Sequence, residues 1–333
     1  MVGLALGQLL IGPISDKYGR KNPLIISLIV YLISTIAIIL FPNVYAMIVL
    51  RFIQGVSSAG AVVISRAIST DLYHGRELAA FFALLMAVNG LAPILSPILG
   101  SVLLELTDWR GIFITLALIG VILLAVSFKF NESLVVEKRL DVPIVKTYYS
   151  LVHVVKNRLF FALVIVQGFA LAAMFAYIAA SPFILQTHYS LSPLMYSLCF
   201  GLNGFAIVLG SKNAGNFKEK VSIKLGLSLM LLVSIYLAVA LTLTLPFLFI
   251  EVGFFLLLLG LGFILPAGSA IAMSLERERA GSASAFFGFV PFFLGGVVSP
   301  LVGIGNIFHS SAIAIVICSA ISFVTFKLVE KKI

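Results

Sequence analysis

The stretch GPISDKYGRKN, residues 12–22, is a charged turn inside an otherwise apolar chain. It carries four formal charges, on Asp16, Lys17, Arg20 and Lys21, and apolar runs precede and follow it. Charges gathered between two apolar runs are typical of a short loop that joins two membrane helices. The stretch therefore favours a membrane protein with several spans, and the composition of the whole chain bears on the same question.

Composition separates this chain from soluble domains. Its 333 residues are 61% hydrophobic and 11% charged, whereas a soluble domain averages about 45–50% apolar and about 25% charged residues. A water-soluble globule of this size cannot bury that much apolar surface. The composition therefore predicts a chain that crosses the membrane several times.

Apolar runs recur along the chain between charged or turn-rich breaks. They cover approximately 1–15, 23–41, 44–66, 78–103, 111–130, 159–185, 193–211, 222–244, 246–270, 281–305 and 310–328. About 20 residues are needed to cross a hydrocarbon core of ~30 Å, so every run but the first predicts a full transmembrane helix. Residues 1–14 rise only about 21 Å as a helix. We expect them to be the second part of a helix whose start is absent, in an N-terminally truncated, all-α chain.

The basic residues indicate the topology. Every Lys and Arg except Arg51 and Arg110 falls in alternate loops, which share one side of the membrane. Cytoplasmic loops carry an excess of Lys and Arg, so this side is expected to be cytoplasmic. The formal net charge of +9 is then explained by loops that face anionic lipid, and we expect no nucleic-acid partner.

A polar segment divides the chain into two bundles. It covers residues 131–158, and we expect a cytoplasmic linker there, between an N-terminal bundle of residues 1–130 and a C-terminal bundle of residues 159–333. When the two halves of the sequence are aligned with a shift of 203 residues, SPILG (96–100) matches SPLVG (299–303), and several charged residues match as well. Two halves in the same orientation are the plan of one large class of transporters.

Arg51 lies about seven residues inside its apolar run. A cation at that depth is costly unless it is paired or lies in a watery cavity, and is therefore a functional hypothesis. The alternative is an arginine whose side chain reaches back to the periplasmic interface.

Motifs of common enzymes are absent from the sequence. It contains no Gly-x-x-x-x-Gly-Lys-Ser/Thr loop for ATP, no Gly-x-Ser-x-Gly nucleophile elbow and no His-Glu-x-x-His metal pair. Cys199 and Cys318 each lie in an apolar run, which favours buried thiols over a metal site or a disulfide. We expect no enzyme, no cofactor, no metal site and no engine driven by ATP.

Several motifs resemble those of one transporter family. GPISDKYGRKNPL resembles the signature between helices 2 and 3 of the major facilitator superfamily, and RFIQG (51–55) resembles the helix 4 signature of its proton-coupled members. NGLAPILSPILG (89–100) resembles the helix 5 signature of drug/proton antiporters. Together with DWRGIF (108–113), these motifs are similar to the bicyclomycin- and chloramphenicol-resistance branch.

The resemblance covers nearly the whole chain and implies a fold. That fold is two pseudo-symmetric helical bundles, with family helices 2–6 in residues 1–130 and helices 7–12 in residues 159–333, or about 11 transmembrane segments here. The first family helix would be absent and the second partial.

The charged turn implies a cytoplasmic latch that holds one state of alternating access. Its candidate residues are Gly12, Asp16, Gly19, Arg20, Lys21, Arg66 and Asp71. Gly12 would let helices approach closely, and Asp16 would accept hydrogen bonds from the N-terminus of a helix that starts near Gly281. Arg20 would pair with Asp71, and Arg66 with Asp16. The alternative is a basic turn that only sets topology.

The resemblance also implies a proton-coupling site at Arg51, Gln54 and Gly55. The arginine would tune a carboxylate that the family usually places on helix 1, which is absent here. Glu105 and Glu251 are the remaining acidic candidates, and both lie at shallow positions in the sequence.

Two further groups of residues are candidates. Gly90, Pro93, Pro97 and Gly100 would make a bent, closely packed antiporter helix, although Gly and Pro are common in membrane helices anyway. Asn89, Gln167, Tyr177, Asn203 and Phe286 are polar or aromatic residues in mid-run, with Gln54, that could line a drug cavity. Hydrogen bonding or packing between helices is the alternative for each.

These expectations combine into one function. The chain would be a proton-coupled secondary transporter, a monomer, that exports small lipophilic drugs across the bacterial inner membrane. The alternatives are a truncated, inactive fragment of such a transporter and a transporter of another small metabolite on the same fold.

Overall fold

The structure is a computed structural model of the chain and describes residues 1–73, 96, 99–139, 154–276 and 280–332. Within these ranges the regular elements are all helices, and no strand occurs in them. The predicted all-α fold is confirmed.

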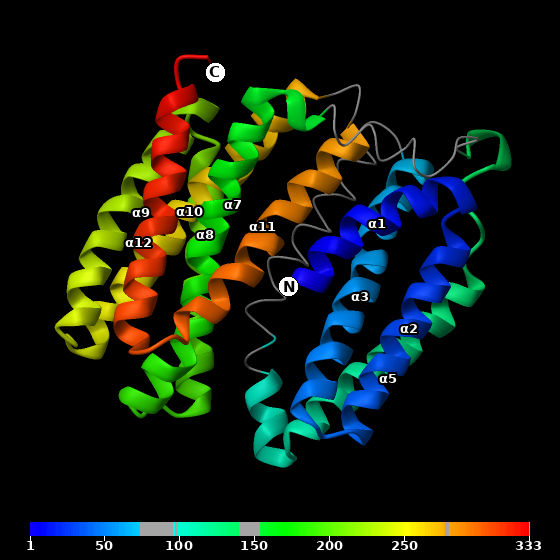
Figure 1. The fold of residues 1–333 in the computed structure, drawn as a ribbon, viewed down its shortest axis with the longest axis horizontal. Coiled ribbons are helices and arrows are strands. Elements are labelled where there is room, and N and C mark those ends of the chain that lie inside the picture. Colours follow the sequence, from blue (N-terminus) through cyan, green and yellow to red (C-terminus); the bar gives the residue numbers. More distant parts are fainter. Residues whose placement is uncertain (74–95, 97–98, 140–153, 277–279, 333) are drawn as a thin grey trace. The chain divides into compact units, whose positions relative to one another are not determined.

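Figure 1 shows the helices of the described residues in their order along the chain. The N-terminal half holds α1 (Val2–Tyr18), α2 (Lys21–Leu40), α3 (Val44–Leu72), α5 (Trp109–Lys129) and the 3-10 turn η1 (Val136–Lys138). The C-terminal half holds α7 (Arg158–Ser181), the π-helical turn η2 (Pro182–His188), α8 (Pro193–Ala214), α9 (Glu219–Thr242), α10 (Phe247–Leu275), α11 (Ala280–Val302) and α12 (Ile307–Val329). In the described part of the chain, nine helices are long and apolar enough to cross a membrane.

Side chains just before the helices explain where several of them begin. An Asn, Asp or Ser side chain accepts a hydrogen bond from the backbone N–H groups of the first turn of five helices; these residues are Asn43, Asp108, Asn157, Ser192 and Asn306. Such caps satisfy N–H groups that have no partner inside the helix. The turn chemistry and the apolar runs therefore agree on the helix boundaries.

The predicted apolar runs match these helices to within a few residues at most ends. The first run is a helix of 17 residues, which is shorter than a full span. The run 78–103 lies mostly outside the described residues, although residues 99–106 are helical. Four candidate residues, Asn89, Gly90, Pro93 and Pro97, also lie outside them.

The chain divides into two compact units. The N-terminal unit takes in Met1–Asn89, Val102–His153 and Ser284–Phe289, and the C-terminal unit takes in Gly90–Ser101, Val154–Ala283 and Val290–Ile333. The change of unit at residue 153 falls inside the predicted linker, residues 131–158. The assignment of family helices to the two bundles stays a prediction.

In the N-terminal unit, α3 packs against both α1 and α2, and α5 packs against α2 (Figure 1). Glycines bring α1 and α3 together. A Cβ at Gly7 would stand 2.6 Å from the Cβ of Ala59, and a Cβ at Gly55 would stand 3.1 Å from the backbone nitrogen of Leu4. Side chains at these positions would push the helices apart, so the close contact requires glycine.

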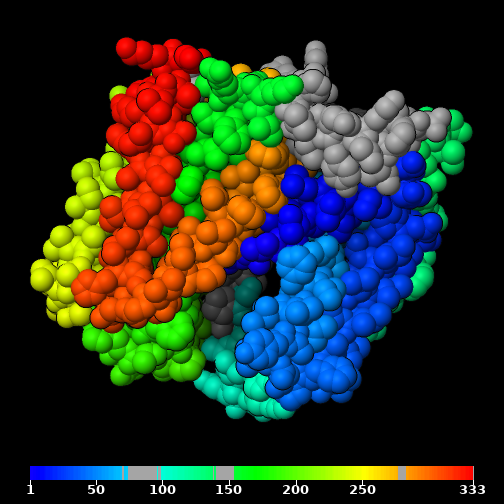
Figure 2. All heavy atoms as spheres, viewed as in Figure 1, coloured from blue at the N-terminus to red at the C-terminus, as the bar shows by residue number. Residues whose placement is uncertain are grey.

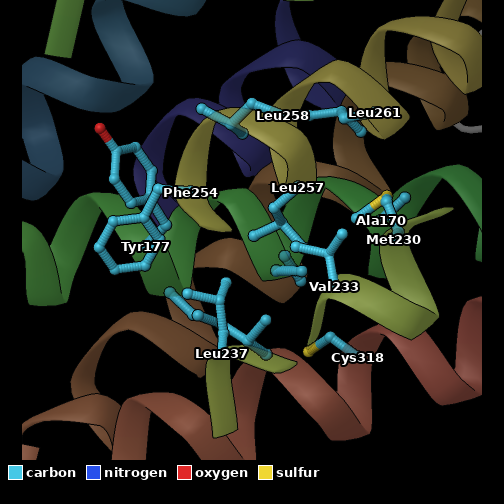
Figure 3. Close-up of a cluster of buried hydrophobic side chains, with 14 of the residues drawn as sticks. Ala170, Tyr177, Met230, Val233, Leu237, Phe254, Leu257, Leu258, Leu261 and Cys318 are labelled. Carbon is cyan, nitrogen blue, oxygen red and sulfur yellow. The ribbon is translucent and has the colours of Figure 1, made fainter. Parts of the chain in front are cut away.

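In the C-terminal unit, α10 packs against α7, α8 and α9, and α12 packs against α7 and α9. The atoms of α12 and α9 lie side by side on the face that Figure 2 shows. A Cβ at Gly262 of α10 would stand 2.8 Å from the Cα of Gly210 on α8. Figure 3 shows the apolar side chains that fill the centre of this unit, including Met230, Leu257 and Cys318.

Apolar side chains also cover much of the outside. On α5, Ile114, Leu118, Ile122 and Val126 follow one another at intervals of four residues, and all are exposed. Residues spaced in this way share one face of a helix. A continuous apolar stripe is expected where a helix faces lipid, and it is unfavourable in water.

Candidate functional site

The charged turn folds around the side chain of Arg20, which lies between α1 and α2 and is only 6% exposed. Its Nε donates to Oδ2 of Asp71 at 2.9 Å, which confirms the predicted pair. Its NH1 donates to Oγ of Ser15 at 2.9 Å and to the carboxylate of Asp16. A buried cation must be paired and hydrogen-bonded, and here the residues that do so come from the ends of α1 and α3.

Glu132, which follows α5, completes the site. Its Oε1 accepts from the backbone N–H of Arg20 at 2.8 Å, and its Oε2 accepts from that of Lys21 at 3.2 Å. The carboxylate thus caps the N-terminus of α2, where the helix dipole favours a negative charge. Oε2 also lies 3.8 Å from NH2 of Arg139. We call Ser15, Asp16, Arg20, Asp71 and Glu132 the Arg20 cluster.

Hydrogen bonding sets the charge of Glu132. Burial by itself would raise the pKa of this carboxyl, but the backbone N–H groups of Arg20, Leu134 and Lys21, together with the charge of Arg139, lower the pKa below its usual value. Glu132 therefore stays ionised at neutral pH, as a helix cap requires.

Gly19 makes this cap possible. Its φ of +90° lies in the region that side chains rarely adopt, and a Cβ there would collide with the carboxylate of Glu132. The latch predicted from the sequence includes Gly19 but not Glu132. The signal in the sequence is an acidic residue two positions after the apolar run 111–130, inside the predicted linker.

Other parts of the predicted latch are arranged differently. Among the ion pairs of the described residues, Asp16 pairs with Arg20 and no Arg66–Asp16 pair occurs. A Cβ at Gly12 would stand 3.6 Å from Cγ1 of Val63, which is an ordinary contact and not the close approach that was predicted. Lys21 donates from Nζ to the backbone oxygen of Phe128 at 3.0 Å. The contact of Asp16 with the start of α11 would join the two units and stays a prediction.

Arg51 is held by neutral groups. Its NH1 donates to Oε1 of Gln54 at 2.8 Å, and the guanidinium lies 5.4 Å from the centre of the Phe113 ring. Nε2 of Gln54 donates to Oγ1 of Thr35 on α2 at 2.7 Å. The structure therefore brings Arg51 and Gln54 together, whereas Gly55 serves the packing of α3 on α1. In the described part of the chain, no carboxylate forms an ion pair with Arg51.

A second polar cluster lies inside the C-terminal unit. Asn203 of α8 donates from Nδ2 to the hydroxyl of Tyr177 on α7 and to Oε1 of Glu251 on α10, both at 3.0 Å. The three residues are 0%, 1% and 5% exposed in that order. Two predicted cavity residues thus meet each other and an acid. Glu251 was expected to be shallow because it is near the start of its helix, but packing of three helices buries it.

The remaining predicted residues have separate surroundings. Gln167 of α7 donates from Nε2 to Oγ of Ser269 on α10 at 3.3 Å, which fits a hydrogen bond between packed helices. Phe286 is half-buried, and its ring centre lies 6.1 Å from that of Phe289. Gly100 has no described atom within 4 Å of where a Cβ would stand. Close packing is therefore not seen at Gly100.

A cavity of about 930 Å³ lies in the N-terminal unit, lined by residues of α1, α2 and α3 and by Arg139. Its walls are mainly apolar, with Ile11, Ile26 and Phe52 among them, and Lys17 and Arg139 supply positive charge. This volume suits a small molecule. None of the predicted cavity residues that the structure describes lines it; these are Gln54, Gln167, Tyr177, Asn203 and Phe286.

Comparisons with known proteins match this arrangement. Residues 1–328 match the family model of the Major Facilitator Superfamily. The Bacillus subtilis protein "Uncharacterized MFS-type transporter YdgK" is 35% identical over 313 residues, which are 92% of this chain and 78% of that protein. A bicyclomycin resistance protein homolog of Haemophilus influenzae is 26% identical over 220 residues, which are 66% of this chain and 54% of that protein.

A solved structure shows the same fold. The bacterial homolog of the human lysosomal transporter Spinster, in an inward-facing and unoccupied conformation, superposes with a TM-score of 0.72 at 14% identity. The match covers 98% of this chain and 90% of that one. The helices, the family model and the Bacillus relative agree, and the chain belongs to the major facilitator superfamily of membrane transporters.

Proposed function

We propose that the chain is a proton-coupled secondary transporter that exports small lipophilic molecules, antibiotics among them, across the bacterial inner membrane by alternating access. The observation that carries the proposal is the Arg20 cluster, because it holds helix ends together through charges and not through apolar packing. The printed name of the Haemophilus relative, a bicyclomycin resistance protein homolog, supports the substrate class.

The chemistry of the cluster suits a latch. Arg20 bonds at once to Asp71 of α3 and to Ser15 and Asp16 of α1. The residues of the Arg20 cluster lie at the ends of four helices, α1, α2, α3 and α5, so a movement of one of these helices relative to the others breaks ion pairs or hydrogen bonds. A buried ion pair is weak evidence for added stability, and in some proteins it selects one arrangement over another. The cluster is therefore suited to holding one conformation and releasing it.

The side chain of Arg51 supports proton coupling. Its charge is exposed, and an amide and an aromatic ring hold it. These neutral partners leave the positive charge free to stabilise the anionic form of a carboxyl group or to attract an anionic substrate. Either use would link the arginine to transport.

Drug accumulation in cells that lack their own efflux pumps tests the proposal. Cells that express the chain should accumulate less of a lipophilic antibiotic than cells with an empty vector, and a proton ionophore should abolish the difference. Expression that leaves accumulation unchanged, with the protein present in the membrane, would contradict export. A difference that survives the ionophore would contradict proton coupling.

The cavity favours a second candidate, the transport of a small amphipathic anion. Lys17 and Arg139 are among its lining residues, and positive charges attract anions and repel cationic drugs. Counterflow in liposomes with matched anionic and cationic lipophilic compounds separates the candidates. Exchange of the anions alone, and its loss in Lys17→Ala, would favour this second substrate class.

A further inference from the structure

Two buried polar atoms of the C-terminal unit have no hydrogen-bond partner although they belong to residues already bonded to each other. Nδ2 of Asn203 donates to Oε1 of Glu251, but Oε2 of Glu251 and Oδ1 of Asn203 are both unsatisfied. Both atoms are acceptors when the acid is ionised, so they cannot bond to each other. A buried polar atom without a partner is unfavourable and needs an explanation.

Among the described residues, the neighbours of Glu251 supply no positive charge. The titratable groups that face it are Tyr177 of α7 and Tyr196 and Cys199 of α8. From α9, Tyr236 bonds to the backbone oxygen of Phe249. In the described part of the chain, no Lys, Arg or His side chain forms an ion pair with Glu251.

Aromatic rings close the site. The ring centre of Tyr177 lies 4.7 Å from that of Phe254 and 5.8 Å from that of Phe200. Figure 3 shows the Tyr177 and Phe254 rings side by side at one end of the apolar cluster. An ionised carboxylate in this buried site would be compensated by no cation among the described residues, which is unfavourable.

A single added proton would give both atoms a partner. An amide and a carboxylic acid can pair through two bonds, one from the amide N–H to the acid carbonyl and one from the acid O–H to the amide carbonyl. The first bond is present, from Nδ2 of Asn203 to Oε1 of Glu251. A proton on Oε2 would supply the second donor, and Oδ1 of Asn203 would accept it. The second hydrogen of Nδ2 remains for the hydroxyl of Tyr177.

We infer that Glu251 and Asn203, oriented by Tyr177, form a proton-binding site in the C-terminal unit. In the enclosed state Oε2 carries the proton and the two-bond pair is complete. When α7, α8 and α10 separate enough to admit water, the proton passes to water and the carboxylate keeps the N–H bond of Asn203. The use of this site for coupling rests on the proposed function, but proton binding itself does not.

Infrared difference spectroscopy of the purified full chain in lipid tests the site. At neutral pH the wild type should show the carbonyl band of a buried protonated carboxyl group, and Glu251→Gln should lack it. Glu105→Gln, which changes an exposed acid, should keep the band. Asn203→Leu should shift it, since the acid loses its amide partner. A wild type without the band, or Glu251→Gln with the band unchanged, would overturn the inference.

Glu251→Gln is expected to fold, so the loss of its infrared band would not result from misfolding. Glutamine at position 251 has the shape of the protonated acid, and its amide N–H can donate to Oδ1 of Asn203 in the same way. Glu251→Gln should therefore unfold at a temperature equal to or above that of the wild type, most clearly at alkaline pH. A lower unfolding temperature at alkaline pH would contradict the two-bond pair.

Transport measurements then separate the site from the proposed function. In liposomes, Glu251→Gln should retain exchange of substrate across the membrane and lose accumulation driven by a pH gradient, as the permanently neutral form predicts. Retained gradient-driven accumulation would overturn the coupling role. A wild type that moves no substrate at all would overturn the proposed function, while the infrared band would still decide on the proton site.

Discussion

Arg20 shows how a single residue can organise a membrane-protein loop. Its guanidinium is buried, so its charge must be matched, and Asp16 and Asp71 match it from two different helices. Removing one member of a buried pair commonly destabilises a protein by about 3–5 kcal/mol, because the other charge is left alone. The charged residues of the turn therefore stabilise the fold, in addition to any effect they have on membrane topology.

Glycine is required at position 19 but not at position 12. Gly19→Ala should destabilise the protein by about 1–3 kcal/mol, the usual strain of a side chain at positive φ, and the new methyl group would also displace Glu132. Thermal unfolding in detergent measures this effect. Gly12→Ala is the matched control and should be neutral or slightly stabilising, because space is available there and alanine favours a helix. Equal losses in both variants would contradict the assignment.

Glu132 makes the stability of the N-terminal unit depend on pH. Its folded pKa is lowered from the usual 4.5 by backbone N–H groups and by Arg139, against the effect of burial. The stability that it contributes is present in full above the unfolded pKa and is lost as the pH falls through the lower, folded pKa. The wild type should therefore lose thermal stability on acidification below about pH 4.5, and Glu132→Gln should lose less over that range. Parallel pH profiles of the two proteins would contradict the cap.

At the scale of the helices, close contacts between backbones set the distance between two helices. That distance brings polar side chains of the two helices within hydrogen-bonding reach. Gly262 of α10 approaches Gly210 of α8, and the same pair of helices carries Glu251 and Asn203. Gly262→Ala should destabilise the C-terminal unit by about 1–3 kcal/mol through overpacking. Thermal unfolding of the purified protein, followed by light scattering, would measure this loss of stability. Gly215→Ala, where the nearest atom is 3.6 Å away, should change stability little.

The helices could be predicted from the sequence, and the contacts between them only in part. Apolar runs and capping residues act locally, so their pattern along the chain marks where each helix begins and ends. Arg20–Asp71 was predicted from charge and spacing because both residues lie at helix ends on one side. The role of Glu132 could not be predicted, because its partners, the N–H groups of Arg20 and Lys21, are more than a hundred residues away in sequence.

Burial of a polar residue was the hardest feature to predict. Glu251 lies in the first turns of α10, a position that suggested a shallow and solvated acid. Its burial depends on how α7 and α8 cross α10, which the hydrophobic pattern of one helix does not contain. Conversely, Tyr177 and Asn203 were selected as isolated polar residues, and only the packing shows that they bond to each other.

At the scale of the whole molecule, the family assignment and the two polar clusters support one account. The N-terminal unit carries the Arg20 cluster, which we propose as the latch, and the C-terminal unit carries the Glu251 site, which we propose as the proton carrier. Each cluster lies at contacts between helices of its own unit. A transporter needs a conformational lock and an energy source, and the two clusters would supply one each.

The most direct test of the central claim is substrate flux in liposomes under an imposed pH gradient, with Asp71→Asn beside the wild type. The account predicts that the wild type moves a lipophilic drug in response to the gradient. Asp71→Asn should slow this flux by roughly tenfold or more, the effect of about 1.4 kcal/mol, because Arg20 loses its partner on α3. Asp108→Asn, which changes an exposed ion pair with Arg110, should leave the flux unchanged. A wild type without gradient-driven flux, or an Asp71→Asn variant as fast as the wild type, would contradict the account.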